Sequence, residues 1–340
     1  MRAAVVGGGV YGCTVAVDLA HAGHQVDLYE RHRALLLGAT RGNQGRLHAG
    51  YHYPRSSATA AAARVDAAGF AARFPAAVDR SGRHCYAVAK QGSLTTAQAY
   101  LAFCDSLGGG HVVADSPLLQ GTSVAVRVPE AFIDVDTLRA QLRLELAAAG
   151  ARVHLGREVD PGTLDADLVV VATYGRGWPV PLRWEVCEVA LVGLGAHYAR
   201  RSFVVMDGPF TSLDPVCGRP GVHALYDVAE SVHAANVGLA PVAPDHLAAL
   251  LDRGPVFTEH TRREAMLAGA RRYFCRLGMP VHHGSLFTVR AVLPDVDATD
   301  ARPTLYHRDG RTVHVLAGKI DGAVAAAERV VTLAGDLVSA

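Results

Sequence analysis

The strongest constraint on the fold is a glycine-rich turn close to the N-terminus. Residues 3–6 (AAVV) form an apolar run of strand length, the spaced glycines Gly7, Gly9 and Gly12 follow, and a helical pattern runs from Cys13 to Ala22. Gly7 permits a tight turn, Gly9 lets a ligand approach the backbone, and Gly12 lets the helix pack close to the strand. The free N–H groups and positive dipole end of such a helix suit phosphates. The pattern predicts the start of a dinucleotide-binding unit.

A second predicted strand, residues 25–30 (QVDLYE), ends in an acidic residue. At that position the carboxylate of Glu30 can accept hydrogen bonds from ribose hydroxyls, and it would repel a 2′-phosphate. We therefore expect an adenine dinucleotide with a free 2′-hydroxyl, which leaves NAD and FAD as alternatives. The expected cofactor contacts in this part of the chain are Gly7, Gly9, Val10, Tyr11, Gly12, Glu30 and Arg31.

The segment after the second strand favours FAD. Residues 43–56 (NQGRLHAGYHYPRS) form a polar loop before an alanine-rich helix expected from about Ser57 to Phe74, whereas a nicotinamide enzyme would continue with a plain helix and strand. The loop resembles the second cofactor-contacting loop of the FAD-dependent D-amino acid oxidase superfamily. It is most similar to the L-2-hydroxyglutarate dehydrogenase branch, whose N-x-G-x-(I/L)-H-A-G-x-x-Y pattern is matched by Asn43, Gly45, Leu47, His48, Ala49, Gly50 and Tyr53.

This resemblance assigns the loop to the isoalloxazine and pyrophosphate of a noncovalently bound FAD. His48 is expected as the catalytic base ahead of His52, because the family loop matches it, and Tyr53 would orient the base or the substrate. A surface loop with incidental histidines and a covalent bond from His48 to the flavin are the alternatives. The expected cofactor contacts are Thr40, Asn43, Gln44, Gly45, Arg46 and Leu47.

A later segment resembles the return of the chain into the FAD domain. Residues 168–171 (LVVV) predict a buried strand, and Thr173 and Gly175 would lie over the cofactor. The sequence departs from the usual AGxW of the family here, because Tyr174 separates these two residues and Trp178 follows later.

The C-terminal segment carries a third block of resemblance. The family motif R-x-x-x-P-D runs from Arg290 to Asp295, and its arginine is expected to bind a substrate carboxylate with a bidentate fork. A helix N-terminus would then face the flavin N1/C2 carbonyl, where negative charge accumulates on reduction. A surface ion pair for Arg290 and a solvated Lys319 are the alternatives. The expected cofactor contacts are Gly318, Lys319, Ile320, Asp321 and Gly322.

The order of the predicted elements gives an α/β fold, α+β overall. A Rossmann-like FAD-binding domain (1–76, 130–180 and 285–340) is expected to carry an inserted, mainly antiparallel-sheet substrate-binding domain (77–129 and 181–284). One helix of the inserted part is expected from Glu259 to Leu277.

Composition excludes several other classes. The 33 basic and 32 acidic residues are spread along the chain, so a nucleic-acid partner is not expected. The sequence contains no run of eighteen apolar residues, so no membrane-spanning helix is expected. The six cysteines include no CxxC pair and the histidines form no HExxH motif, so we expect no metal site. We expect the thiols to be reduced and the protein to be cytoplasmic.

We therefore expect an FAD-dependent oxidoreductase, a dehydrogenase or oxidase, that oxidises a CH–OH group by hydride transfer to flavin N5. The expected substrate is a small molecule that carries a carboxylate: a 2-hydroxy acid, a sugar acid or a specialised metabolite. The alternatives are an amine or amino-acid oxidase of the same fold, an NAD-linked dehydrogenase, and a noncatalytic flavin-binding protein. The electron acceptor is left open between oxygen, a quinone and another flavoprotein.

Overall fold

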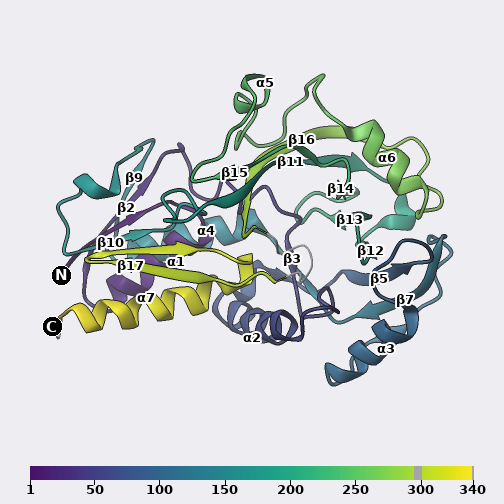
Figure 1. Ribbon diagram of the computed structural model, residues 1–340, viewed down its shortest axis with the longest axis horizontal. Coiled ribbons are helices and arrows are strands. Elements are labelled where there is room, and N and C mark those ends of the chain that lie inside the picture. The colour runs from purple at the N-terminus through teal and green to yellow at the C-terminus, as the bar shows by residue number, and fades with distance from the viewer. Residues whose placement is uncertain (295–300, 339–340) are drawn as a thin grey trace.

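The computed structural model describes residues 1–294 and 301–338, whose strands form three sheets (Figure 1). The first sheet has six strands in the order β17-β18-β10-β1-β2-β9, and all pair in parallel except β17 with β18. Its strands are β1 (Arg2–Val6), β2 (Gln25–Glu30), β9 (Arg152–Leu155), β10 (Leu168–Val171), β17 (Leu305–Asp309) and β18 (Thr312–Leu316).

Helices cover one face of this sheet, and α1 is the most buried of them. Nine of its twelve residues are buried, because α1 packs between the sheet and the two helices α4 and α7. A helix apolar all round is expected only in such an interior position. The helices that surround this core are α1 (Val10–His21), α2 (Ser57–Arg73), α4 (Val135–Ala148) and α7 (Ala323–Val338).

The second sheet has nine strands and is antiparallel apart from the parallel pair β12 and β5. Strand β16 pairs with β11 over nearly its whole length, so residues 285–292 belong to this sheet although 285–340 were expected in the other domain. Its strands are β5 (Arg83–Ala89), β6 (Val112–Val113), β7 (Thr122–Val128), β11 (Leu182–Gly193), β12 (Arg201–Met206), β13 (Thr211–Pro215), β14 (Val222–Asp227), β15 (Val232–Gly238) and β16 (Val281–Val292).

A small third sheet lies at the junction of the other two. It consists of β3 (Arg46–Leu47), β8 (Ala131–Ile133) and β4 (Val78–Asp79), with β8 in the middle. In Figure 1, β3 lies near the centre of the molecule, between the parallel sheet and the strands of the second sheet. The predicted α/β class, with an antiparallel second part, is confirmed.

Two predicted helices differ from the observed ones. The first helix begins at Val10 instead of Cys13, because Gly9 serves directly as its N-cap residue. The helix expected from Glu259 to Leu277 is the shorter α6 (Arg263–Arg271). Its start is delayed because the residues just before it are hydrogen-bonded to the carboxylate of Glu188.

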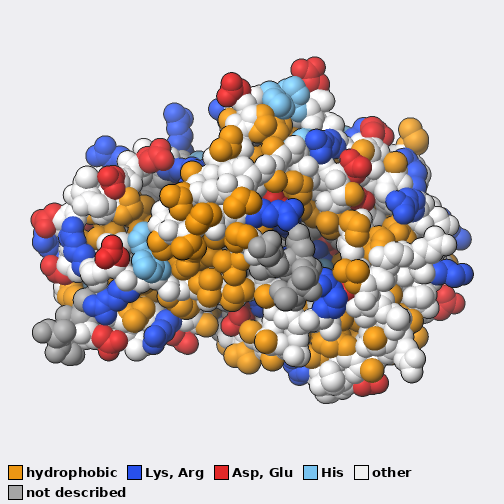
Figure 2. Space-filling model, in the orientation of Figure 1, with side chains coloured by type: hydrophobic (Ala, Val, Ile, Leu, Met, Phe, Trp, Pro, Cys, Tyr) orange, Lys and Arg blue, Asp and Glu red, His pale blue; other side chains and the backbone are white. Residues whose placement is uncertain are grey.

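The remaining helices are short and lie toward the second sheet. They are α3 (Ala97–Ser106) and α5 (Asp245–Ala248). On the face shown in Figure 2, apolar side chains gather left of centre and charged ones lie mostly toward the rim. None of the helices in the described ranges is both long and apolar enough to cross a bilayer.

Candidate active site

The glycine turn after β1 has the tight geometry that its sequence predicts. Gly7 has φ +110°, and a Cβ there would lie 2.5 Å from the carbonyl oxygen of Ala172. A Cβ on Gly12 would lie 1.8 Å from the carbonyl oxygen of Gly7. Only glycine fits such close backbone approaches. The turn therefore brings the start of α1 against the end of β10.

A cavity of about 290 Å³ opens at this turn. The first intrahelical bond runs from Cys13 N to Gly9 O, so the N–H groups before it have no partner within the helix. One of these N–H groups, that of Val10, donates a hydrogen bond to Thr40 Oγ1 at 3.2 Å. The cavity is lined by eight of the expected cofactor contacts: Gly7, Gly9, Val10, Tyr11, Glu30, Arg31, Thr40 and Thr173.

Glu30 has a role in the turn that the sequence did not predict. One carboxylate oxygen accepts a hydrogen bond from Gly8 N at 2.6 Å, and the other accepts from His32 N at 2.7 Å. The carboxylate therefore fastens β2 to the turn, and each oxygen keeps a lone pair for a further donor. Its expected contact with a ribose stays a prediction.

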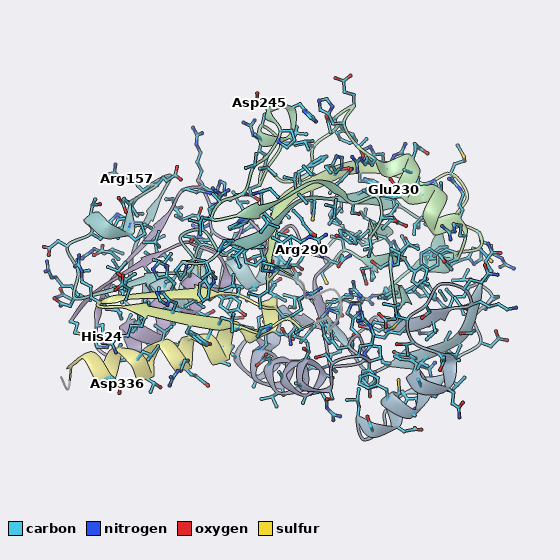
Figure 3. The ribbon with its side chains drawn as sticks, in the orientation of Figure 1. His24, Arg157, Glu230, Asp245, Arg290 and Asp336 are labelled. Carbon is cyan, nitrogen blue, oxygen red and sulfur yellow. The ribbon has the colours of Figure 1, made fainter. Side chains whose placement is uncertain are left out.

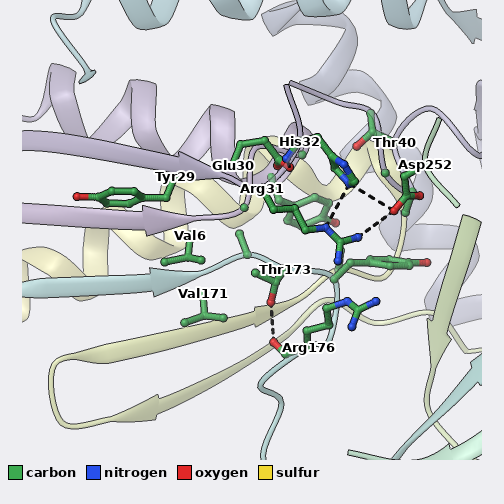
Figure 4. A pocket seen from close by; sticks show the side chains of 18 of the residues that line it. Val6, Tyr29, Glu30, Arg31, His32, Thr40, Val171, Thr173, Arg176 and Asp252 are labelled. Carbon is green, nitrogen blue, oxygen red and sulfur yellow. Dashed lines mark hydrogen bonds and ion pairs between the residues drawn. The ribbon is translucent and has the colours of Figure 1, made fainter. Parts of the chain in front are cut away.

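The far wall of this cavity is an ion-pair cluster (Figure 4). Asp252 accepts from Arg31 Nη2 at 2.9 Å and lies 3.5 Å from His32 Nε2. Its other oxygen accepts from Thr288 Oγ1 at 3.0 Å. Arg176 lies on the opposite side in Figure 4, and its backbone carbonyl accepts from Thr173. Asp252 thus ties the end of β2 to strand β16 across the cavity.

A larger cavity of about 560 Å³ adjoins the first. The two share the wall residues Ala39, Tyr174, Thr288 and Val289. Among the expected site residues, the larger cavity is lined by Asn43, Gln44, Arg46, His52 and Arg290. The site therefore consists of a glycine-turn compartment and a second compartment bordered by the antiparallel sheet.

Arg290 lies at the centre of the molecule, on β16, whereas His24, Arg157 and Asp336 lie at its edges (Figure 3). It faces Glu185 directly across the β11–β16 pair and donates to Glu185 Oε2 from Nε at 2.7 Å and from Nη2. Arg183 holds the other oxygen at 2.9 Å. The fork of Arg290 is thus partly engaged by an ion pair, which is the alternative expected from the sequence, although its partner Glu185 is buried and not at the surface.

The two loop histidines lie side by side. The ring centroids of His48 and His52 are 5.1 Å apart, and Tyr53 meets both rings edge-on at 5.6 and 5.1 Å. Burial and the neighbouring Arg46 lower the pKa of His48 well below 6.5, and burial lowers that of His52 likewise. His52 lines the larger cavity; His48 lies behind it and bonds through Nδ1 to Tyr86 Oη at 3.2 Å.

The start of the loop is shaped by its own amide side chains. Asn43 donates to Thr40 O at 2.6 Å and accepts from Gly45 N at 2.5 Å. Gln44 donates to Ser212 and accepts from Arg46 at 3.0 Å, and Arg46 lies 3.4 Å from the buried carboxylate of Asp214. Asn43 and Gln44 therefore fix the loop conformation as well as bordering the cavity.

The N-terminal end of α7 packs on α1 and borders neither cavity. Tyr11 Oη donates to Lys319 O at 2.6 Å, and a Cβ on Gly322 would lie 2.7 Å from that hydroxyl oxygen. Lys319 Nζ lies 3.8 Å from both Asp66 and Asp321 and above the ring of Tyr53. Lys319 is therefore a buried ion-pair partner and not solvated.

Several expected site residues thus border neither cavity. Gly12 and Gly175 make close packing contacts, the latter beside Trp184. Leu47 is in the core, and Asp295 of the expected motif lies outside the described residues. The residues without a direct place on a cavity wall are Gly12, Gly45, Leu47, His48, Tyr53, Gly175, Gly318, Lys319, Ile320, Asp321 and Gly322.

Four charged or polar residues of this site were not predicted from the sequence. Asp252 and Glu185 lie more than 100 residues from Arg31 and Arg290, which they bind, and Tyr86 and Glu130 reach His48 from two other strand regions. No local pattern marks residues that act through such distant contacts. Burial of an acidic residue inside an apolar strand, as for Glu185 in WEVCEVALVG, was the one available signal.

The glycine-turn compartment fits the expected cofactor. The turn has no room for side chains at Gly7 and Gly12, and the start of α1, whose first N–H groups have no partner within the helix, borders the cavity. These are the donors and the shape that the pyrophosphate of a dinucleotide requires. Gly9, Val10 and Thr40 would hold that pyrophosphate.

Comparison with known proteins agrees with this fit. The model of the DAO family of FAD-dependent oxidoreductases matches residues 2–177, more than half of the chain. The FAD-dependent monooxygenase FPY4 of Fusarium mangiferae is 29% identical over 351 residues, covering 98% of this chain and 90% of that protein. A probable FAD-dependent monooxygenase, kojA of Aspergillus oryzae, is 27% identical over 99% of this chain and 86% of that protein.

Solved structures share the fold at low sequence identity. Glycine oxidase from Geobacillus kaustophilus has a TM-score of 0.71 and 16% identity, with 99% of this chain and 95% of that chain covered. L-proline dehydrogenase from P. horikoshii has a TM-score of 0.71 and 14% identity, with 98% and 93% covered. With its glycine-turn compartment and the family match over residues 2–177, the chain belongs to the DAO family of FAD-dependent oxidoreductases.

Proposed function

We propose that this oxidoreductase acts on the CH–OH group of a small molecule that carries a carboxylate, such as a 2-hydroxy acid or a sugar acid. The observation that supports the proposal is His52 on the wall of the larger cavity, beside the cofactor compartment and in the same cavity as Arg290. When bound, FAD supplies the hydride acceptor for such an oxidation. The similarity of the loop to the L-2-hydroxyglutarate dehydrogenase branch is part of this proposal.

The histidine pair suits an alcohol substrate. Oxidation of an alcohol requires a group that takes the hydroxyl proton, and a neutral imidazole nitrogen does so at neutral pH. Because the pKa values of His48 and His52 are lowered well below 6.5, both rings are uncharged at pH 7. His52 borders the cavity, so we place it in contact with the substrate and His48 behind it.

The charges on the cavity wall favour an anionic substrate over a protonated amine. Glu185 is held by two arginines, and Asp207 is held by Arg55 Nε at 2.7 Å. On the part of the wall that the structure describes, both carboxylates are thus engaged in ion pairs. We assign the substrate carboxylate to the guanidinium of Arg290, which suits a planar anion.

The division of the chain into an FAD-binding and a substrate-binding domain belongs to the same proposal. The parallel sheet carries the glycine turn, and the antiparallel sheet carries Glu185 and Arg290. Substrate binding is therefore assigned to residues 77–129 and 181–284 together with strand β16.

An anaerobic screen tests the function. The purified yellow protein is mixed with 2-hydroxy acids, sugar acids, amino acids and simple amines, and loss of the flavin absorption bands is followed. We expect bleaching by members of the first two groups. Bleaching by amino acids or amines alone would show an amine oxidase, and no bleaching by any compound would contradict the proposal as a whole.

Histidine variants sharpen the result. His52→Ala should slow bleaching by about 10²- to 10⁴-fold, the usual contribution of a general base. His24→Ala is the matched control, because His24 lies at the edge of the molecule and should bleach at the wild-type rate (Figure 3). If His52→Ala bleached as fast as His24→Ala, His52 would have no part in the reaction.

A further inference from the structure

A buried hydrogen-bond chain runs from the interior to the ring of His48. Tyr86 on β5 donates its hydroxyl proton to Glu130 Oε2 at 2.6 Å. The other oxygen, Oε1, accepts from Ala49 N at 2.8 Å, which fixes the backbone next to His48. The side chain of Glu130 has no solvent exposure, and Tyr86 is 1% exposed.

This chain determines which ring nitrogen of His48 carries the proton. A tyrosine hydroxyl has a single proton, and that of Tyr86 is given to Glu130, so its oxygen can only accept from His48 Nδ1 at 3.2 Å. Nδ1 must therefore be protonated. In a neutral ring the lone pair is then on Nε2, and within the described part of the chain no hydrogen bond reaches that atom.

The surroundings of His48 keep the ring neutral. Burial, Arg46 and Lys319 all oppose a positive charge on it. Glu130 acts in the opposite direction from 3.8 Å. His52, Tyr53 and Tyr86 also face the ring; burial lowers the pKa of His52 and raises that of Tyr86, so both are uncharged at neutral pH.

We propose that Glu130 and Tyr86 are positioning residues that hold His48 as its Nδ1–H tautomer and so present Nε2 as the proton-accepting atom behind His52. The proposal rests on the proposed function, because it gives the histidine pair a second accepting nitrogen. In this tautomer the lone pair of Nε2 lies on the ring beside His52, whose centroid is 5.1 Å away, and Tyr86 and Glu130 fix the orientation of the His48 ring. Neither Glu130 nor Tyr86 borders the larger cavity, so neither is assigned to substrate binding.

The first test reads the tautomer without any substrate. The full-length protein with FAD bound is labelled with ¹⁵N-histidine, and the His48 signals are identified by their loss in His48→Ala. We expect a protonated Nδ1 and a bare Nε2 in the wild type, and a mixture of tautomers in Tyr86→Phe. A bare Nδ1 in the wild type, or an unchanged tautomer in Tyr86→Phe, would overturn the inference.

Tyr100→Phe is the matched control for that variant. Tyr100 is also fully buried and also donates one hydrogen bond, to Tyr51 O at 3.1 Å, but it does not contact His48. Removal of the Tyr100 hydroxyl should leave the His48 tautomer unchanged. If Tyr100→Phe altered the tautomer as much as Tyr86→Phe, the effect would come from general loosening, and the inference would fail.

The second test measures the reaction with the hydroxy acid that bleaches the protein fastest. Tyr86→Phe should lower kcat by about 10- to 100-fold, the typical cost of losing a partner that orients a catalytic group, and should leave KM within a factor of two. Glu130→Gln, which can still accept from Tyr86, should retain more activity than Glu130→Leu. In the wild type, kcat should stay level from pH 8 to 6.5 and fall only at lower pH.

The two tests separate the possible failures. If no hydroxy acid bleaches the protein, the proposed function fails, and the tautomer measurement still decides whether Glu130 and Tyr86 orient His48. If hydroxy acids bleach the protein but Tyr86→Phe turns over at the wild-type rate, the proposed function stands and the positioning role is refuted. Melting temperatures of the five variants are measured alongside, and Tyr86→Phe must remain folded with FAD bound for its kinetics to count.

Discussion

The two compartments of the active site are built in different ways. The glycine-turn compartment is centred on the local β1–turn–α1 unit, with its close backbone approaches at Gly7 and Gly12, and distant segments such as residues 157–161 and 171–177 complete its walls. The larger compartment is bordered by charged side chains that come from distant strands and are held in pairs, such as Arg290 with Glu185. The comparison teaches that the proposed cofactor compartment depends on the local geometry of a turn, whereas the proposed substrate compartment depends on long-range pairing.

Gly12→Ala should have the largest effect, because it breaks the local compartment. Its Cβ would lie 1.8 Å from Gly7 O, a backbone atom that cannot move aside without opening the turn. We expect the variant to contain no FAD, measured by absorbance of the purified protein. Gly69→Ala is the control: its Cβ meets no atom within 4 Å, and alanine should stabilise α2 by about 0.5–1 kcal/mol. A yellow Gly12→Ala protein would contradict the close packing.

Arg290→Lys should break the long-range compartment while leaving the cofactor in place. Lysine keeps the charge but loses the fork, so KM for a carboxylate substrate should rise by about 10- to 100-fold, the value of charge-assisted hydrogen bonds. Arg183→Lys is the control, because it changes the other arginine on the same carboxylate of Glu185. An equal rise in both variants would show that the ion-pair network matters and not the fork of Arg290.

Asp252→Asn should have an intermediate effect, since Asp252 closes the glycine-turn compartment from the side of the antiparallel sheet. Its carboxylate is 6% exposed and binds Arg31, which is 37% exposed. After allowance for that exposure, the pair is worth about 1.4 kcal/mol, so FAD should dissociate about tenfold faster. Release is followed by the fluorescence of free FAD after dilution. Asp165→Asn, which breaks the exposed pair with Arg2, should not change the rate.

The smallest effect is expected at Asp321, a buried acidic residue just before α7 whose carboxylate lies 3.8 Å from Lys319 Nζ. Burial raises its pKa to about 7, so the folded protein binds a proton between about pH 4 and 7 that the unfolded chain has released. Stability should therefore decrease as pH rises from 5 to 8. Between pH 5 and 8 the melting temperature of Asp321→Asn should fall by about 2 °C less than that of the wild type. Asp336→Asn, which changes an exposed acid, should melt with the wild-type pH dependence.

The same contrast explains what could be predicted from the sequence. The strand Leu168–Val171 and the β1–turn–α1 unit follow from apolar runs and glycine spacing, which are local signals. The helix expected from Glu259 to Leu277 begins later, at Arg263, because Glu188, some seventy residues away, holds the residues before α6. Likewise, the pairing of Arg290 with Glu185 depends on the register of two strands about a hundred residues apart. No periodic pattern encodes such a register.

The wall common to both compartments has a consequence for engineering. Ala39, Tyr174, Thr288 and Val289 border both, and Thr288 also bonds to Asp252. Mutant libraries aimed at new substrates should therefore leave these four positions unchanged, because a substitution there would alter the FAD compartment together with the larger cavity. Leu94, Val189 and Val228 border the larger compartment only, and diversity introduced at them can alter selectivity without that conflict.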